Sequence, residues 1–316
     1  MVNAVHSGRR RFNAWVRRGG VRGRTLVLAL PWLWLVFFFL VPFAIVLTIS
    51  FAKTDWFGMP PYTPVLQTTA GHLHFNGLFA GNYRFLFTES LYADAFLNSL
   101  KVAGISTCFC LLVGYPMAYG IARAPASRRN VLLLMVILPF WTSFLLRVYA
   151  WIGLLGNNGV VNRLLMALGW IHDPIVMLQT DFAMYVGIVY SYLPFMVLPL
   201  YTNLEKHDAA LLEAAVNLGC RPWRAFLSIT LPLSVPGIVA GSMLVFIPAV
   251  GEYVIPRMLG GPNSLMLGRV LWDEFFLNKN WPMASAVAVA LLLVLVVPLA
   301  ILQRYGAREA RGVSAE

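Results

Sequence analysis

The chain has 316 residues, of which 59% are hydrophobic and only 12% are charged. Average soluble domains contain about twice that proportion of charged residues, so this composition excludes an ordinary soluble protein. A helix needs about 20 mostly apolar residues to cross the hydrocarbon core of a bilayer, so the length is best divided into membrane spans.

Six apolar segments follow one another along the sequence. They predict transmembrane helices at about residues 25–50, 95–121, 131–155, 182–201, 236–259 and 283–302. The first segment is too long for the apolar region of a signal peptide, and no small-residue cleavage site follows it. The sequence therefore predicts an all-α polytopic membrane protein with six transmembrane helices.

The basic residues are unevenly distributed and predict an orientation. With the N-terminus inside the cell, 16 of the 24 lysines and arginines lie on the inner side, whereas 8 of the 13 acids lie on the outer side. This positive-inside bias predicts that the basic tails, residues 1–24 and 304–316, are both cytoplasmic. The arginines of the first tail are interpreted as an anchor for the first span, so no nucleic-acid partner is expected.

The segments between the spans differ in length and character. Residues 51–94 form an outer, periplasmic loop that is rich in proline at its start and ends in a short amphipathic helix. Residues 203–235 form the longest inner loop. No phosphate-binding loop, nucleophile elbow, or histidine and cysteine spacing for a metal is present, so we expect neither an enzyme nor a bound cofactor. If the protein does work across the membrane, the energy comes from an ion gradient or from another chain.

The inner loop has local signals for two short helices. Asp208 is a suitable N-cap for the alanine-rich stretch that follows, and Gly219 stands where a C′ residue ends a helix. Pro222 suits the first position of a second helix, which Leu231 and Pro232 are expected to end. The alanine ridge of the first helix suits a groove on a partner protein. A helical loop that only lies at the lipid headgroups is the open alternative.

This loop resembles the EAA motif of permease subunits of ABC importers. The residues that match its E-A-A-x3-G-x9-I-x-L-P spacing are Glu213, Ala214, Ala215, Gly219, Ile229, Leu231 and Pro232. The resemblance extends from about Gly81 to Leu302. The stretches TSFLLRVYAW, YLPFMVLPLY, VFIPAVGEYVIPRMLGGP and GRVLWDEFF are similar to putrescine and spermidine permeases of the PotB/PotH type.

The resemblance implies a MetI-like type I importer fold, with the permease core in residues 95–303. It also implies several partners: a second permease subunit like PotC or PotI, a dimeric ATPase that binds ATP and Mg²⁺, and a periplasmic polyamine-binding protein. In that family the EAA loop is the coupling helix that docks on the ATPase. A permease for another solute, such as iron or thiamine, and a stand-alone secondary transporter are the alternatives.

Ionisable residues inside membrane spans indicate a function or a paired charge. Arg147 and Glu252 both lie about 12 Å from the outer ends of their predicted spans, at about 1.5 Å per residue. They are expected either to pair with each other or to leave Glu252 facing a cavity, where it receives an ammonium group of the substrate.

Further candidates for the substrate path are aromatic and acidic. The aromatic candidates, whose rings attract cations, are Trp141, Tyr149, Tyr190, Tyr192 and Tyr253. The acidic candidates on the outer side are Asp181, Asp273 and Glu274. Packing is the alternative for the rings, and solvation or pairing with the binding protein is the alternative for the acids. Prolines within spans three to five predict kinks and place the cavity wall there.

Overall fold

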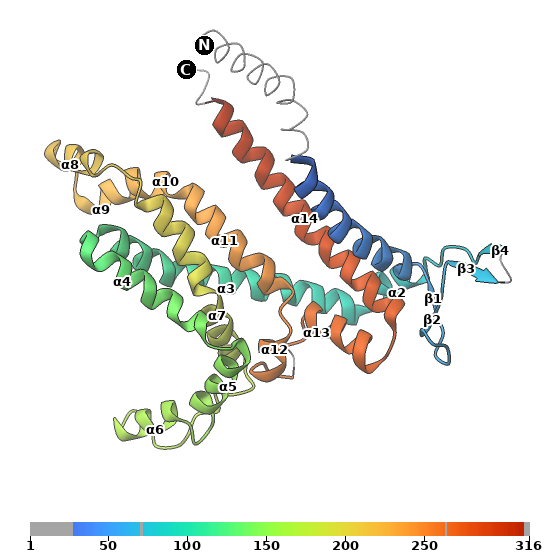
Figure 1. The fold of residues 1–316 in the computed structure, drawn as a ribbon. Coiled ribbons are helices and arrows are strands. Elements are labelled where there is room, and N and C mark those ends of the chain that lie inside the picture. The colour runs from blue at the N-terminus through green and yellow to red at the C-terminus, as the bar shows by residue number, and fades with distance from the viewer. Residues whose placement is uncertain (1–27, 70–71, 263, 313–316) are drawn as a thin grey trace, which may run out of the picture.

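The computed structural model describes residues 28–69, 72–262 and 264–312, and within these residues the protein is mostly helical (Figure 1). The predicted basic tail, residues 1–24, lies outside the described residues. The first described helix is Leu28–Ser50. Most of its large side chains are exposed, as expected for a helix that meets lipid or another membrane subunit.

The predicted outer loop contains strands that the all-α prediction did not include. Four strands form two antiparallel hairpins: β1 (Lys53–Thr54) with β2 (Tyr62–Thr63), and β3 (Leu66–Thr69) with β4 (His72–Phe75). Threonine and aromatic residues in short runs favour strands, and Pro60 and Pro61 lie in the first hairpin's turn region. Helix α2 (Gly81–Thr88) follows, as the amphipathic pattern predicts.

The remaining helices follow in chain order. They are α3 (Ser90–Arg123), α4 (Ala126–Ile137), the 3₁₀ turn η1 (Leu138–Trp141), α5 (Phe144–Leu155), α6 (Val160–Ala167), α7 (Asp181–Leu204), α8 (Ala209–Asn217), α9 (Pro222–Ala225), the π turn η2 (Phe226–Thr230), α10 (Leu231–Leu233), α11 (Val235–Val250), α12 (Val254–Met258), α13 (Leu267–Trp272), the π turn η3 (Asp273–Leu277) and α14 (Trp281–Gly312).

The described residues contain four helical segments that are long and apolar enough to cross a membrane. These are Leu28–Ser50, Ser90–Arg123, Phe144–Ala167, which comprises α5 and α6, and Asp181–Leu204. A fifth candidate is the pair Pro222–Leu233 and Val235–Val250, which meet at a bend of 63°. Helix α14 has a shorter apolar stretch, Trp281–Val296. The polytopic membrane class is confirmed, and four to five spans stand against the six predicted.

The predicted third span, residues 131–155, is interrupted at Pro139, where the proline predicts a kink. Helix α4 ends at Ile137, a 3₁₀ turn occupies Leu138–Trp141, and Thr142 is extended before α5 begins at Phe144. Pro139 lies in this turn. Because proline has no N–H and its ring crowds the preceding turn, the chain at this point leaves the helical path.

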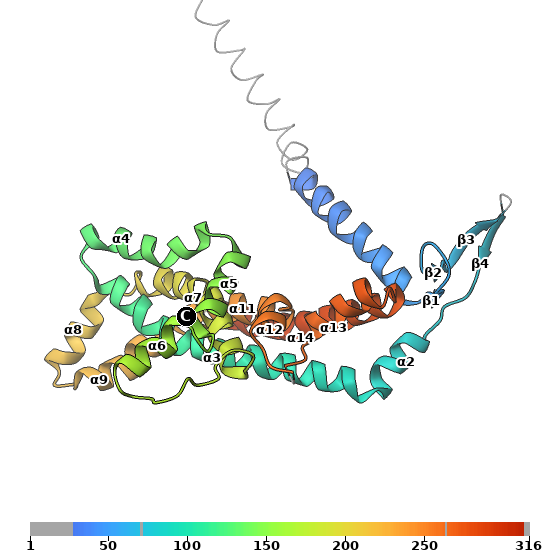
Figure 2. The same cartoon turned by 90° about the horizontal axis from the view of Figure 1, so that it is seen from below.

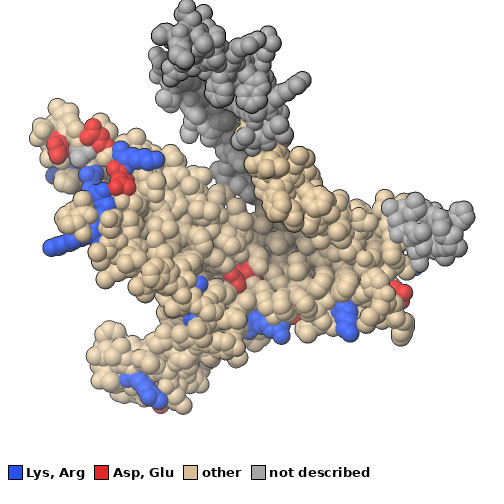
Figure 3. All heavy atoms as spheres, in the orientation of Figure 1, with Lys and Arg blue, Asp and Glu red and all other residues tan. Residues whose placement is uncertain are grey.

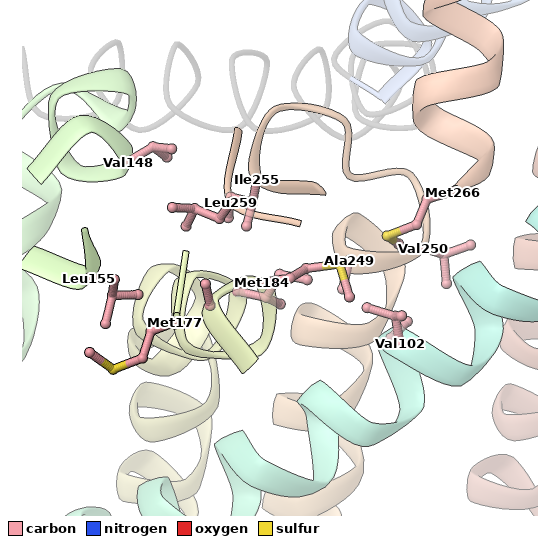
Figure 4. Close-up of a cluster of buried hydrophobic side chains, with 13 residues drawn as sticks. Val102, Val148, Leu155, Met177, Met184, Ala249, Val250, Ile255, Leu259 and Met266 are labelled. Carbon is pink, nitrogen blue, oxygen red and sulfur yellow. The ribbon is translucent and has the colours of Figure 1, made fainter. Parts of the chain in front are cut away.

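Helices α3, α7 and α11 pack against one another and form the centre of the protein. Buried side chains from all three converge there, including Val102 of α3, Met184 of α7 and Val250 of α11 (Figure 4). Glycine permits their close approach, because a Cβ on Gly241 would lie 2.8 Å from the Met196 sulfur. A Cβ on Gly187 would likewise lie 2.6 Å from Leu259.

The molecule is elongated, and its two ends differ. Helices α8 and α9 lie at one end, and the two β hairpins lie at the other (Figure 2). Helix Leu28–Ser50 rises away from the rest of the chain in the same view. In Figure 1, α6 and α12 lie across the central helices from α8. The segment that resembles the EAA loop is therefore separated from α12 by the length of α7 and α11.

Candidate functional site

The EAA segment, residues 203–235, begins with a short capped helix, α8. The Asp208 side chain accepts a hydrogen bond from the Ala210 N–H at 2.9 Å, and Gly219 follows the helix with φ of +80°. The Cys220 N–H then donates to the Ala215 carbonyl at 3.0 Å, which satisfies a carbonyl at the helix end. The predicted helix, its N-cap and its terminal glycine are confirmed.

Helix α8 has no buried residue whose side chain is described, and it projects from the body of the protein (Figure 1). Its apolar side chains face outward as well, since Val216 is 51% exposed and Leu218, at its C-cap, is 88% exposed. Glu213 and Ala214 are exposed, and Glu213 has no hydrogen bond or ion pair within the described part of the chain. An exposed helix with an apolar surface and an available carboxylate suits a partner's groove.

The second helix of the EAA segment is longer than predicted. Pro222 occupies its first position as expected, but the helix passes through Pro232 and ends at Leu233. A π turn before the proline allows the helix to continue. There the Leu231 N–H donates to the Phe226 carbonyl, five residues earlier, so the turn contains one residue more than an α-helical turn. The expectation that Leu231 and Pro232 end the helix is therefore wrong.

Contacts with α3 attach this second helix to the body. The Phe226 ring meets the rings of Tyr115 and Tyr119 edge-on, with centroids 5.7 Å apart in each pair. The Tyr115 hydroxyl also hydrogen-bonds the buried Ser234 hydroxyl at 2.9 Å, at the bend that leads into α11. The EAA segment thus combines a free helix, α8, with a firmly packed one that continues into a candidate span.

The predicted fifth span, residues 236–259, is interrupted at Glu252, four residues before Pro256, which is one of the prolines that predict kinks. Helix α11 ends at Val250, and α12 begins at Val254. In a continuous helix the Pro256 ring would clash with the carbonyl four residues earlier, that of Glu252. The chain turns at this point, and Glu252 is only 7% exposed.

The Glu252 carboxylate is satisfied by four donors at this break. One oxygen, Oε1, accepts from the backbone N–H groups of Tyr253, Val254 and Ile255 at 3.2, 3.0 and 3.4 Å. The other oxygen, Oε2, accepts from the Tyr192 hydroxyl of α7. Because a buried carboxylate without donors is strongly disfavoured, these bonds explain how the acid is accommodated there. The structure thus brings together two candidates, Tyr192 and Glu252.

The predicted ion pair between Arg147 and Glu252 is not formed. The ion pairs among described residues are Arg129–Glu205, Arg257–Asp273 and Arg269–Asp273. The Arg147 guanidinium instead lies 4.9 Å from the ring centre of Phe140 and 5.6 Å from that of Phe144. Its Nε and one terminal nitrogen are buried without a hydrogen-bond partner in the chain.

The three acidic candidates all have partners within the chain. Asp273 pairs with Arg257 at 2.9 Å and with Arg269 at 3.8 Å. The Glu274 carboxylate accepts from the Tyr92 hydroxyl at 3.1 Å, and that of Asp181 accepts from the Ser264 hydroxyl at 3.0 Å. These acids therefore connect elements of the protein and are not simply solvated charges.

The aromatic candidates do not gather into one site. Tyr253 stacks on Trp272 with centroids 4.5 Å apart, and Arg257 lies 5.6 Å from the Tyr253 ring centre. Tyr190 meets Trp151 edge-on and lines a groove of about 370 Å³ that also includes Arg147. The other two, Trp141 and Tyr149, are 76% and 58% exposed.

Charged side chains lie mainly at the two ends of the face seen in Figure 3. They gather over α8 and α9 at one end and along α6, α12 and α13 at the other. The surface between them is largely uncharged, apart from an acidic patch beside the hollow between α11 and α14. A band with few charged residues between two charged ends is typical of a protein that crosses a bilayer, because charges within the membrane are costly.

The family model for the inner membrane component of binding-protein-dependent transport systems matches residues 111–311. The chain belongs to this family. A relative, the spermidine/putrescine transport system permease protein PotB of Haemophilus influenzae, is 39% identical over 270 residues, which is 85% of this chain and 89% of the relative. This permease is accordingly a multi-pass inner-membrane subunit of an importer, and the alternative of a stand-alone secondary transporter is excluded.

Two solved structures show the fold of this permease. A chain of a bacterial ABC transporter that imports the acidic polysaccharide alginate superposes with a TM-score of 0.67, at 19% identity over 94% of this chain and 99% of that one. A chain of the MetNI methionine transporter superposes with a TM-score of 0.50, at 18% identity over 71% and 96%. These two superpositions confirm the predicted type I importer fold.

Two residues of α3 and α13 that pack around the break, Ser99 and Gly268, are not among the predicted site residues. The Ser99 hydroxyl accepts from the buried Leu267 N–H at 2.8 Å, across 168 positions of sequence. A Cβ on Gly268 would lie 2.3 Å from the Gly251 carbonyl oxygen and 2.7 Å from that of Glu252. Serine and glycine are common within apolar segments, so no pattern in the sequence identifies these two positions.

Proposed function

We propose that this permease forms half of the transport path of an ATP-driven importer of polyamines, putrescine or spermidine or both. The observation that supports this substrate most strongly is the 39% identity to a spermidine/putrescine permease across 85% of the chain. The similarity includes most of the permease core and is not confined to the EAA segment, which permeases for many solutes share.

The complete importer contains several other chains. A second permease subunit, similar to PotC or PotI, completes the transport path. An ATPase dimer binds ATP and Mg²⁺, and a periplasmic binding protein delivers the polyamine. The exposure of the helix Leu28–Ser50 and of α8 supports this assembly, because both present apolar surface that an isolated chain leaves uncovered.

The proposed topology has six spans, with both termini in the cytoplasm. The sixth span is the apolar part of α14, beginning at Trp281, and the third includes the broken segment from α4 to α5. In this orientation the EAA segment faces the cytoplasm, whereas the β hairpins and α13 face the periplasm. The positive-inside distribution of the basic residues supports this arrangement.

Helix α8 is the proposed coupling helix. Its exposed Glu213, beside Ala214 and Ala215, meets a basic group in a groove of the ATPase, and Gly219 allows the sharp exit from the helix. Leu231 and Pro232 lie in the packed second helix that leads into α11. Closure of the ATPase dimer moves α8, and the packed helix transmits that movement to the spans by rigid contact.

The substrate path is proposed to pass the broken span. Glu252 supplies the negative charge there, and Tyr192 holds its carboxylate. Arg147, which lines a groove with Tyr190, stays a further candidate. A carboxylate oxygen has lone pairs for more than one donor, so an ammonium group can bind Glu252 without displacing every existing bond. The rings of Trp141 and Tyr253 and the acids Asp181, Asp273 and Glu274 stay further candidates along this path.

The test is ATP-dependent uptake of labelled putrescine and spermidine by the complete complex in proteoliposomes. We expect uptake of at least one polyamine, and we expect Glu252→Gln to raise its KM about tenfold, because the amide keeps the size and hydrogen bonds of the side chain but not its charge. Uptake of iron or thiamine, with no uptake of either polyamine, contradicts the proposed substrate. An unchanged KM in Glu252→Gln removes Glu252 from the path.

A further inference from the structure

The Tyr192–Glu252 hydrogen bond connects α7 to the turn between α11 and α12, although the two residues are 60 positions apart in the sequence. Tyr192 lies in the middle of α7, a helix of 24 residues. Glu252 lies in the turn between α11 and α12, where helical hydrogen bonding is interrupted. The bond therefore joins a long, continuous helix to the beginning of a short helix, α12, that follows a break.

Packing beside this bond places α7 directly against α12. A Cβ on Gly187 would lie 2.6 Å from the Leu259 side chain and 3.0 Å from the Ile255 side chain, so these two side chains pack directly on the α7 backbone at the glycine. Ile255 and Leu259 are fully buried, and they belong to the same cluster as Met184 of α7 (Figure 4). The apolar contact holds α12 near α7, whereas the directional Tyr192 bond determines its orientation.

The segment of the chain that joins α11 to α12 is not helical. It passes through Gly251, Glu252 and Tyr253, none of which lies in a helix. Three of the four hydrogen bonds of the Glu252 carboxylate are to N–H groups at the start of α12, so the carboxylate is attached to α12. Tyr192 is the partner from another element.

We propose that Tyr192 and Glu252 are a positioning pair that makes α12 follow the movement of α7 during transport. This inference rests on the proposed function. Helix α7 ends at Leu204, shortly before α8 begins at Ala209, so a displacement of α8 reaches the middle of α7 through a continuous helix. The hydrogen bond from the Tyr192 hydroxyl then transmits this displacement to α12. The non-helical residues between α11 and α12 allow α12 to turn relative to α11.

The experiment compares Tyr192→Phe with the matched control Tyr185→Phe in the complete complex. Tyr185 lies on α7 seven residues earlier, which is about two helical turns, and its hydroxyl has no hydrogen bond in the described part of the chain. The measured quantity is the number of polyamine molecules imported per ATP hydrolysed. We expect this ratio to fall about tenfold in Tyr192→Phe, because a hydrogen bond to a charged group is lost, and to be unchanged in the control.

The ratio separates positioning from general destabilisation. A variant that only lowers the amount of folded complex lowers transport and ATP hydrolysis together, so the ratio does not change. If Tyr192→Phe has the wild-type ratio, the proposed pair does not position α12 and the inference is overturned. If wild-type complex imports no polyamine, the proposed function fails instead, so the two failures are distinguishable.

A second pair of variants tests the same inference if the Tyr192→Phe complex assembles poorly. Glu252→Gln keeps an acceptor for the three N–H groups and a partner for the tyrosine hydroxyl, so it is the reference for the double variant, and its own ratio is measured first. The double substitution Tyr192→Phe/Glu252→Gln removes the connection without leaving a buried charge short of a donor. A lower ratio in the double variant than in Glu252→Gln supports the pair, and an equal ratio in the two variants contradicts it.

Discussion

The EAA segment and the break near Glu252 both interrupt an apolar run with short helices and prolines, but different interactions form them. The cap of α8 links Asp208 to Ala210, two residues away. The break depends on Tyr192, which is 60 positions from Glu252, and on Ser99, which is 168 positions from Leu267. A helix that projects from the body must be stabilised by its own residues, whereas a buried turn can rely on neighbours that are distant in sequence.

Charge reversal on α8 should have the largest effect on transport. We expect Glu213→Lys to lower ATP-dependent uptake more than about tenfold, because losing a charge partner at an interface costs about 2–5 kcal/mol. Glu213 has no partner in the described chain, so the folded permease itself should be unaffected. The control is Asn217→Lys, an exposed position at the end of α8. Equal uptake by Glu213→Lys and wild type contradicts the proposed coupling role.

Crowding the break should have an intermediate effect, on stability. We expect Gly268→Ala to destabilise the purified complex by about 1–3 kcal/mol, because the new Cβ meets two carbonyl oxygens and the turn has to shift. Gly153→Ala is the matched control, since a Cβ there meets nothing within 4 Å. Thermal unfolding of both variants measures the difference. If the two variants melt together, the break does not depend on this close contact.

Removing the cap of α8 should have the smallest of these effects. We expect Asp208→Ala to cost about 1 kcal/mol of helix stability, which corresponds to about fivefold weaker binding of the permease to its purified ATPase. Asp208→Asn keeps a capping oxygen and should bind like wild type. An effect of the alanine variant on the melting of the whole permease, without an effect on ATPase binding, would show that the cap is not a local feature of α8.

Proline positions show why the continuity of the spans was only partly predictable. Pro116, Pro194 and Pro248 all lie inside helices that continue through them. The chain leaves the helical path near Pro139 and before Pro256. A proline removes one backbone bond in every case, but whether the helix then breaks depends on which other groups satisfy the freed carbonyl and N–H groups. At Glu252 the side chain itself supplies that alternative.

The candidate site, like the continuity of the spans, was only partly predictable from the sequence. Glu252 is a candidate because an ionisable side chain inside an apolar segment indicates a function or a paired charge, and Tyr192 is one because aromatic rings attract cations. Their pairing is not predicted, and an ion pair with Arg147 is one of two alternatives for Glu252, because the two charges lie at a similar depth. The structure shows Arg147 against two phenylalanine rings instead. Depth along a helix is visible in sequence, whereas the direction in which a side chain points toward another helix is not.

The sequence by itself determined the membrane class, the approximate positions of most of the helices, and the capped helix α8 with Asp208 and Gly219 at its ends. These features depend on composition and on residues within a few positions of one another. Only the tertiary structure decided at which prolines two of the spans break, which donors the buried Glu252 carboxylate receives, and which glycines lie against another backbone. Those features depend on contacts between α3, α7 and the segment after α11, and the residues in contact are chosen by packing in three dimensions.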